Sequence, residues 1–217
     1  MRAFIRLVIL ELLLATILFG SAGRLDLPWF WALIGFNFVF MLCAIRAIEP
    51  DLMRERLRPA PGGVDRGLRW LMMPFLLGQL IVAGLDVGRF GWSGPVPLVV
   101  HGTGLLFYVS GIVLAMRALV VNRFFSPVVR IQEERGHRLI TEGPYRFVRH
   151  PGYAGMLLSF LGSGLVLGSW WSLLPLIPVV VLILRRTILE DHYLRKHLEG
   201  YVGYAERVRY RLLPGVW

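Results

Sequence analysis

Long runs of apolar residues alternate with short polar segments along the chain. A membrane core of roughly 30 Å is crossed by about 20 apolar residues in a helix. The runs that approach or exceed this length, and two shorter ones after them, lie at residues 4–20, 28–48, 68–88, 96–121, 153–168 and 170–185. Gly168 and Ser169 separate the last two, which predicts a hairpin. The pattern predicts an all-α fold, a polytopic membrane bundle of about six segments.

Composition agrees with a membrane protein. Of the 217 residues, 56% are apolar and 18% are charged, and the mean hydropathy is +0.61. A soluble domain carries about 25% charged residues, so this balance requires a lipid environment. The first segment also has the layout of a secretory signal peptide, with Arg2 and Arg6 ahead of its apolar run. Because further spans follow, we interpret it as the first membrane span.

Positive charge is concentrated on one side of this arrangement. Apart from Arg24 and Arg89, every Lys and Arg lies on that same side. They precede the first span, lie in the two long loops and the tail, or, as Arg46 and Arg117, stand at the trailing ends of the second and fourth spans. The positive-inside rule then places both termini and the two long loops in the cytoplasm, and in a bacterial cell the membrane would be the inner one. Anionic membrane lipids beside this face account for the net charge of +10, so no nucleic-acid partner is expected.

The sequence does not indicate a metal site or a disulfide. Cys43 is the only cysteine and lies in the second span. His192 and His197 are five residues apart, whereas side chains that share a helix face are three or four apart. We therefore expect no metal.

The two long loops differ in character. Residues 49–66 are polar, with a short helix expected from Pro50 to Leu57, and are interpreted as a connector. Residues 122–152 end in TEGPYRFVRHPGYAG (141–155), where Gly and Pro force turns around aromatic and cationic side chains. Loops so dense in special residues are usually functional.

Arg149 and His150 precede Pro151 at the expected start of the fifth segment. Proline suits the first position of a helix, so both side chains would lie beside unpaired amide groups, where anions bind. The alternative is that they contact lipid headgroups, as interfacial cations do. The triplet alone does not decide between the two.

From Arg185 onward the chain is polar enough to leave the membrane as a cytosolic helix. Helical spacing places one stripe along it, formed by Arg186, Glu190, Tyr193, His197, Tyr201, Tyr204 and Val208. Arg186 and Glu190 emerge where the hairpin meets the interface, so we expect the pair to be partly buried. Residues 208–217 return apolar side chains to the membrane interface.

Three polar residues fall within the spans, and none is assigned to the site. An ionisable residue inside a membrane is a functional candidate, but no motif surrounds Glu11. It is either a hydrogen-bonded packing residue or faces a cavity. Packing is the preferred interpretation for Gln79 and His101.

Three C-terminal runs together carry a family resemblance. GHRLITEGPYRFVRHPGYAG (136–155), RTILED (186–191) and GYVGYAERVRYRLLPG (200–215) resemble the isoprenylcysteine carboxyl methyltransferase family and its bacterial relatives, with phospholipid methyltransferases more distant. The first half matches only in hydropathy and in ERLRP (55–59). We accordingly divide the chain into four N-terminal spans, 1–121, and a methyltransferase-like region, 122–217.

The resemblance implies a pocket for S-adenosylmethionine between the membrane hairpin and the cytosolic C-terminal helix. The residues expected to contact this cofactor are His137, Arg138, Leu139, Ile140, Tyr145, His150, Pro151, Gly152, Tyr153 and Glu190. Arg186 is expected to face the methyl acceptor and to form the catalytic pair with Glu190. The family commonly has two glutamates where this chain has Glu190 and Asp191.

The chemistry of methyl transfer suits such a site. The methyl group leaves a sulfonium by in-line displacement, so the protein mainly aligns the reactants and excludes water. A carboxylate acceptor is already nucleophilic and needs only a guanidinium such as Arg186 to hold it. A thiol or an amine would lose a proton to Glu190, Tyr201 or Tyr204. A lipophilic acceptor entering between spans is expected, with a carboxylate preferred.

Two other functions remain open. Sterol reductases that use NADPH have a similar Arg-His-Pro-x-Tyr stretch, but this chain is short for that group and lacks its acidic, Cys-containing segment. A transporter or assembly protein would place charged or broken-helix features near the midplane of paired spans. Apart from Glu11, the special polar residues gather instead at the cytoplasmic edge. The identity of the acceptor and the oligomeric state stay open.

Overall fold

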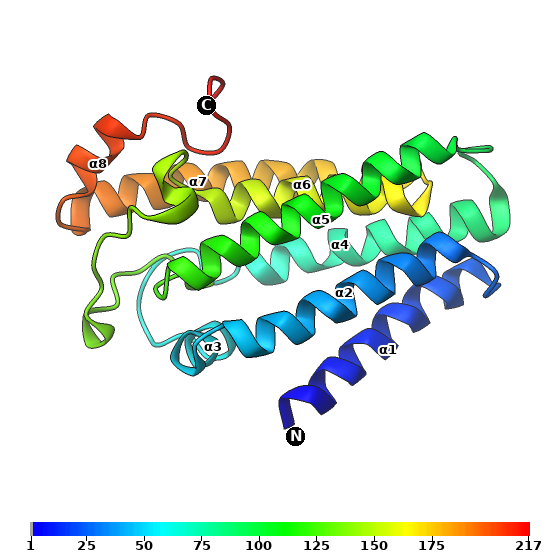
Figure 1. Ribbon diagram of the computed structural model, residues 1–217, viewed down its shortest axis with the longest axis horizontal. Coiled ribbons are helices and arrows are strands. Elements are labelled where there is room, and N and C mark those ends of the chain that lie inside the picture. The colour runs from blue at the N-terminus through cyan, green and yellow to red at the C-terminus, as the bar shows by residue number, and fades with distance from the viewer. Residues whose placement is uncertain (1) are drawn as a thin grey trace.

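Six long helices run roughly along the long axis of the molecule (Figure 1). They are α1 (Arg2–Ala22), α2 (Pro28–Ala47), α4 (Leu68–Gly84), α5 (Leu98–Val121), α6 (Pro151–Leu167) and α7 (Leu176–His197). The computed structural model describes residues 2–217, and these contain no β-strand beyond a single bridge between Val64 and Val129.

Five segments are long and apolar enough to cross a membrane. They are Phe4–Ala22, Pro28–Ala47, Leu68–Phe90, Leu98–Val121 and Trp171–His197. The helix α6 is shorter, with 17 residues. Large apolar side chains cover the outside of these helices, for example Leu12 at 61% and Leu98 at 72% exposure, which suits contact with lipid. The predicted fold class, an all-α polytopic membrane bundle, is confirmed.

Proline and glycine set several helix boundaries as the sequence predicted. Pro151 begins α6, because the N–H that proline lacks would be unpaired in a first helical turn anyway. The short helix α3 (Pro50–Leu57) has the predicted bounds. Gly168, with a φ of +74°, ends α6, and the turn η4 (Trp171–Leu173) leads into α7. The predicted hairpin is therefore present.

Glycines bring α5 and α6 into backbone contact. A Cβ atom on Gly111 of α5 would lie 2.5 Å from the backbone nitrogen of Ser159, and one on Gly155 of α6 would lie 2.5 Å from the backbone oxygen of Gly111. Gly104, seven residues before Gly111, and Gly162, seven residues after Gly155, repeat the contact. Small residues allow membrane helices to pack this closely. We call this glycine contact between the two helices the seam. It fixes the position of α6, whose first turn contributes to the site described below.

The polar residues within the spans pair with neighbouring helices. Asn37 donates a 2.6 Å hydrogen bond to the carboxyl group of Glu11. The amide of Gln79 donates to the hydroxyl of Ser163 at 2.8 Å, and Nδ1 of His101 lies 2.8 Å from an α6 carbonyl oxygen. The packing interpretation of Gln79 and His101 is confirmed.

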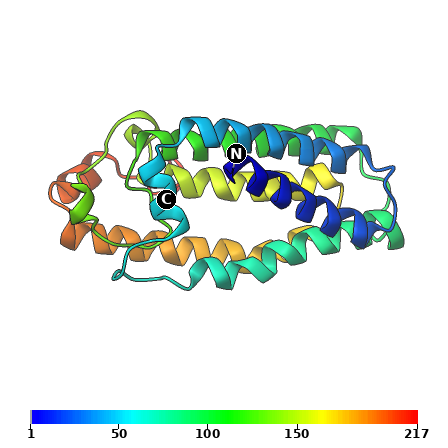
Figure 2. The same cartoon turned by 90° about the horizontal axis from the view of Figure 1, so that it is seen from below.

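The irregular segments collect towards one end of the bundle. There α3, the segment 122–150 and α8 (Tyr201–Arg207) lie in both views (Figure 1, Figure 2). The segment contains two short turns, η2 (Glu133–Arg135) and η3 (Gly143–Arg146). The opposite end carries a π-helical turn, η1 (Leu85–Phe90), at the end of α4.

The continuous stripe predicted from Arg186 to Val208 is wrong in its second half. Leu198 adopts an extended conformation that ends α7, and Gly200, with a φ of +76°, turns the chain before α8 begins. Tyr201 and Tyr204 therefore come from a separate helix. Their return beside α7 brings them to the pocket that Glu190 also lines.

A candidate active site at one end of the bundle

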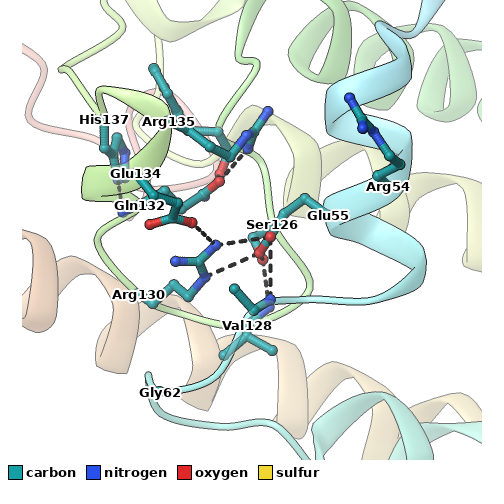
Figure 3. Close-up of polar contacts among 12 residues, drawn as sticks. Arg54, Glu55, Gly62, Ser126, Val128, Arg130, Gln132, Glu134, Arg135 and His137 are labelled. Carbon is teal, nitrogen blue, oxygen red and sulfur yellow. Dashed lines mark hydrogen bonds and ion pairs between the residues drawn. The ribbon is translucent and has the colours of Figure 1, made fainter.

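A buried ion-pair cluster fixes the segment 122–150 to α3. Figure 3 shows the guanidinium of Arg130 between the carboxylates of Glu55 and Glu134. Its Nη2 donates to Glu55 at 2.8 Å and to Glu134 at 2.6 Å, and the hydroxyl of Ser126 donates to Glu55 at 2.8 Å. Burial alone would raise the pKa of Glu55, but the hydrogen bonds from Arg130 and Ser126 lower it. The charged cluster therefore holds the segment in place.

His137 is kept neutral beside this cluster (Figure 3). Burial lowers its pKa to about 4, and its Nδ1 accepts a 3.2 Å hydrogen bond from the backbone N–H of Gln132, which only the neutral ring can do. The ring stacks on Phe124 with 4.5 Å between centroids. The pair presents an aromatic wall to the space beside it.

That space is a pocket enclosed by the segment 122–150, the start of α6, the end of α7 and α8. It measures about 640 Å³ including its open mouth. The sequence-predicted residues that line it are His137, Arg138, Leu139, Ile140, Tyr145, His150 and Glu190. The pocket is also lined by residues that were not predicted from the sequence, among them Asn122, Phe124, Leu194 and Leu198. We call it the loop pocket.

Two buried tyrosines shape one wall of the loop pocket. The amide of Asn122 donates to the hydroxyl of Tyr145 at 3.1 Å, and the hydroxyl of Tyr204 donates to the backbone oxygen of Tyr145 at 2.7 Å. Burial raises the pKa of both phenols. Both are therefore neutral at physiological pH and serve as hydrogen-bonding and stacking surfaces.

The segment 138–140, which has no regular secondary structure, forms another wall. Among the described residues, 138–141 make no backbone hydrogen bond with any other part of the chain. These residues are exposed or half-buried. The backbone groups of residues 138–140, which line the loop pocket, are therefore available to a ligand.

Arg149 was expected to bind an anion or to contact lipid headgroups, and the structure gives it a different role. Its guanidinium donates to both oxygens of Asp191, at 2.7 and 3.2 Å, and to the backbone oxygens of Val208 and Arg209. The side chain is only 2% exposed, so it contacts neither a lipid headgroup nor solvent. Because its donors are satisfied internally, Arg149 ties the C-terminal tail to α7.

His150 differs from its neighbour. Its Nε2 atom is buried and has no hydrogen-bond partner among the described residues, with the nearest carboxylate oxygen, on Asp191, 3.6 Å away. A buried polar atom without a partner is unusual. Since His150 lines the loop pocket, this nitrogen is available to a bound polar group.

Asp191 is the main residue that sequence reasoning missed. It is 1% exposed and accepts hydrogen bonds from Arg149, Arg211 and the hydroxyl of Tyr201. The only signal in the sequence was the adjacent pair of acidic residues. Glu190 points towards the loop pocket, while Asp191 joins α7 to α8 and the tail.

A second pocket lies between α4, α6 and α7, and we call it the membrane-edge pocket. Its lining residues are Arg56, Leu68, Arg69, Met72, Phe125, Ser126, Pro127, Tyr153, Met156, Ile183 and Arg186. Phe125 and Ser126 line both pockets. The two spaces therefore share a wall.

A chain of hydrogen bonds connects the two pockets. Nε of Arg186 donates to the hydroxyl of Tyr153 at 2.6 Å, and that hydroxyl donates to Oε2 of Glu190 at 2.5 Å. The side chains of Arg186 and Glu190 are 7% and 20% exposed, so the predicted partial burial of this pair is confirmed. Tyr153, predicted to contact the cofactor, lines the membrane-edge pocket, and its hydroxyl reaches Glu190 in the loop pocket.

Pro151 and Gly152, also predicted to contact the cofactor, are buried in the first turn of α6. Neither lines the loop pocket. A Cβ atom on Gly152 would lie 2.6 Å from the ring of Phe125. Glycine at this position lets the phenylalanine ring pack against the first turn of α6.

About half of the chain is similar in sequence to methyltransferases. Residues 99–200 match the phospholipid methyltransferase family. Protein-S-isoprenylcysteine O-methyltransferase B of Arabidopsis thaliana is 34% identical over 108 residues, which are 48% of this chain and 55% of the relative. A probable protein-S-isoprenylcysteine O-methyltransferase of Oryza sativa subsp. indica is 35% identical over 108 residues, 48% and 56% of the two chains. The Schizosaccharomyces pombe enzyme is 32% identical over 114 residues, 51% and 48% of the two chains.

Proposed function

We propose that this chain, whose resemblance to the isoprenylcysteine carboxyl methyltransferase family is confirmed over about half its length, is an S-adenosylmethionine-dependent methyltransferase. The chain spans about half the length of the relatives that it matches. The observation that carries the proposal is the pair of adjoining pockets linked through Arg186, Tyr153 and Glu190. Adjoining pockets can bring two reactants together, provided that the shared side chains of Phe125 and Ser126 leave a passage in which the donor methyl group meets the acceptor atom.

The loop pocket suits S-adenosylmethionine. This cofactor supplies a methyl group on a positively charged sulfur, which becomes a neutral thioether when the group leaves. Glu190 offers a carboxylate to the positive charges of the cofactor, and His150 offers a buried nitrogen without a partner. The free backbone of residues 138–140 and the ring of His137 suit the edges and face of the adenine ring. The polar and aromatic groups that line the loop pocket therefore match the groups of the cofactor.

The membrane-edge pocket suits an amphiphilic acceptor. Leu68, Met72, Met156 and Ile183 give it an apolar side that continues into the membrane-spanning helices. Arg186 gives it a cation that would hold a carboxylate with one oxygen lone pair free for attack. We therefore propose methyl transfer to a carboxylate on a lipophilic molecule, with the methyl ester as product. The names of the relatives, which specify an isoprenylcysteine, support this choice.

The site would work at the cytoplasmic face of the membrane. The segment 122–150, α3 and α8 gather towards one end of the bundle (Figure 1), and the positively charged loops lie in these same segments. The positive-inside rule assigns such an end to the cytoplasm, where S-adenosylmethionine is made.

Calorimetric titration of the detergent-purified protein tests the cofactor. S-adenosylhomocysteine should bind, and Glu190→Ala and His150→Ala should each weaken its binding at least tenfold, while Glu199→Ala, at an exposed position, should not. NADPH should not bind. Preferential binding of NADPH would instead support a reductase, and absence of binding by either compound would support a non-enzymatic role.

Transfer of a radioactive methyl group tests the acceptor. With labelled S-adenosylmethionine, N-acetyl-S-farnesylcysteine should become a base-labile ester. A lipid amine such as phosphatidylethanolamine is the alternative acceptor that the family match suggests. Label in the amine but not in the acid would refute a carboxylate acceptor.

A further inference from the structure

Arg56 on α3 reaches the membrane-edge pocket from a part of the chain that lies outside the matched region 99–200. Its Nη1 donates to the backbone oxygen of Phe125 at 3.2 Å, and the guanidinium lies 5.4 Å from the centroid of the Phe125 ring. These contacts fix the guanidinium at the shared wall of the two pockets.

Arg56 has no acidic partner in the part of the chain that the structure describes. In the neighbouring loop, Arg123, Arg130 and Arg135 each pair with a carboxylate. No carboxylate oxygen of the described residues lies within 4.0 Å of the Arg56 guanidinium. Burial, together with the positive charge of Arg186, lowers the pKa of Arg56. Two guanidiniums that face one pocket repel each other, and an anion between them removes that repulsion.

Asp65 is the carboxylate nearest to Arg186 on this side of the pocket. Its Oδ2 lies 3.5 Å from Nη1 of Arg186, which is longer than the roughly 2.7–2.9 Å of a strong charge-assisted hydrogen bond. Asp65 is also the one non-glycine residue with a positive φ, +65°, among those described. The bridge between Val64 and Val129 holds it there. The contact with Arg186 is therefore loose, and a better-placed anion can replace it.

We propose that Arg56 is a specificity-determining residue, which together with Arg186 binds the acid group of the methyl acceptor while Asp65 is displaced from Arg186. The inference rests on the proposed function, because it assigns the membrane-edge pocket to the acceptor. Each guanidinium would bind one oxygen of the carboxylate. The acceptor is then an amphiphile with an acidic headgroup, and the paired cations exclude an amine headgroup by charge repulsion.

The test measures acceptor binding rather than turnover. The protein is reconstituted in nanodiscs and saturated with S-adenosylhomocysteine, and the Kd is measured for tritiated N-acetyl-S-farnesylcysteine and for its uncharged carboxamide. The wild-type protein should bind the acid at least tenfold more tightly than the carboxamide. Arg56→Gln should remove most of this preference by weakening the acid alone, and Arg56→Lys should restore part of it.

Two further variants sharpen the test. Asp65→Asn, which keeps a residue that tolerates positive φ, should strengthen binding of the acid severalfold because it removes the competing carboxylate. Arg54→Gln is the matched control, since this side chain lies on the same helix and is 81% exposed. It should change neither Kd.

Three results would overturn the proposal. Equal weakening of acid and carboxamide by Arg56→Gln would show a structural role only. An acid Kd in Arg56→Gln equal to that in Arg54→Gln would show no role. A wild-type protein that binds both compounds equally would show no acid recognition. Failure of the wild-type protein to bind S-adenosylhomocysteine would refute the proposed function itself, and the calorimetric titration detects that separately.

Discussion

His137 makes the stability of the candidate site depend on pH. The unfolded chain takes up a proton on this residue near pH 6.5, whereas the folded chain does so only at about pH 4. Across that interval the unfolded state binds more protons, so acid favours unfolding. The stabilisation is complete above pH 6.5 and is lost as the pH falls towards 4.

A matched pair of variants isolates this contribution. His137→Phe keeps an aromatic ring against Phe124 but cannot titrate. We expect the melting temperature of the wild type to fall more steeply than that of the variant between pH 6.5 and 4.5. His192→Gln, at an exposed position, should follow the wild type. Parallel curves for wild type and His137→Phe would contradict the assignment.

Substitution of two adjacent acidic residues should have different effects, one on thermal stability and the other on ligand affinity. Asp191→Asn leaves the buried guanidinium of Arg149 without its charged partner, and breaking such a pair costs about 3–5 kcal/mol. We expect a large drop in thermal stability. Glu190→Gln, one position earlier and 20% exposed, should melt close to the wild type and yet lose affinity for S-adenosylhomocysteine. Similar melting temperatures for the two variants would show that they share one role.

The sequence predicted the residues with local signatures and missed those defined by distant contacts. His137–Ile140, Tyr145, His150 and Glu190 follow from the resemblance, and the structure brings them around one pocket. Asp191 and Arg56 depend on partners from other segments. Arg56 lies in ERLRP (55–59), the one stretch of the first half that resembles the family, but this stretch alone assigned it no role.

The seam between α5 and α6 supplies a prediction about packing. Gly111→Val places a side chain where the backbone of α6 already lies, and overpacking of this kind costs about 1–3 kcal/mol or more. We expect a clear loss of thermal stability and of the monodisperse peak in size-exclusion chromatography. Gly102→Val on the same helix, with open space around it, is the control and should behave as the wild type.

Helix positions were predictable where composition alone decides them. Apolar runs set the first four spans to within a few residues, and prolines set the starts of α3 and α6. The last helix, α7, continues past residue 185, the predicted end of its span, to His197. The end of α7 was not predictable from periodicity, because Leu198 and Gly200 interrupt a stripe that the spacing of side chains continues. Backbone conformation, rather than side-chain pattern, decided the outcome there.

The orientation of the whole protein in the membrane is open to a direct test. In a Cys43→Ser background, a membrane-impermeant maleimide should label Leu25→Cys in intact cells, because Leu25 lies next to Arg24 on the side with little positive charge. Val202→Cys on α8 should react only after the cells are permeabilised. Both positions are well exposed, at 66% and 48%. The reverse pattern would contradict the assigned orientation.

The hydroxyl of Tyr153 has a consequence for how the binding of one ligand affects the affinity for the other. It donates to Glu190 on one side and accepts from Arg186 on the other, so occupancy of either pocket alters the hydrogen bonding of the other. The two ligands are then heterotropic effectors, and reciprocity requires each to change the affinity of the other by the same factor. The factor is the ratio of the Kd values of one ligand measured with and without the other. It should differ from one in the wild type and approach one in Tyr153→Phe.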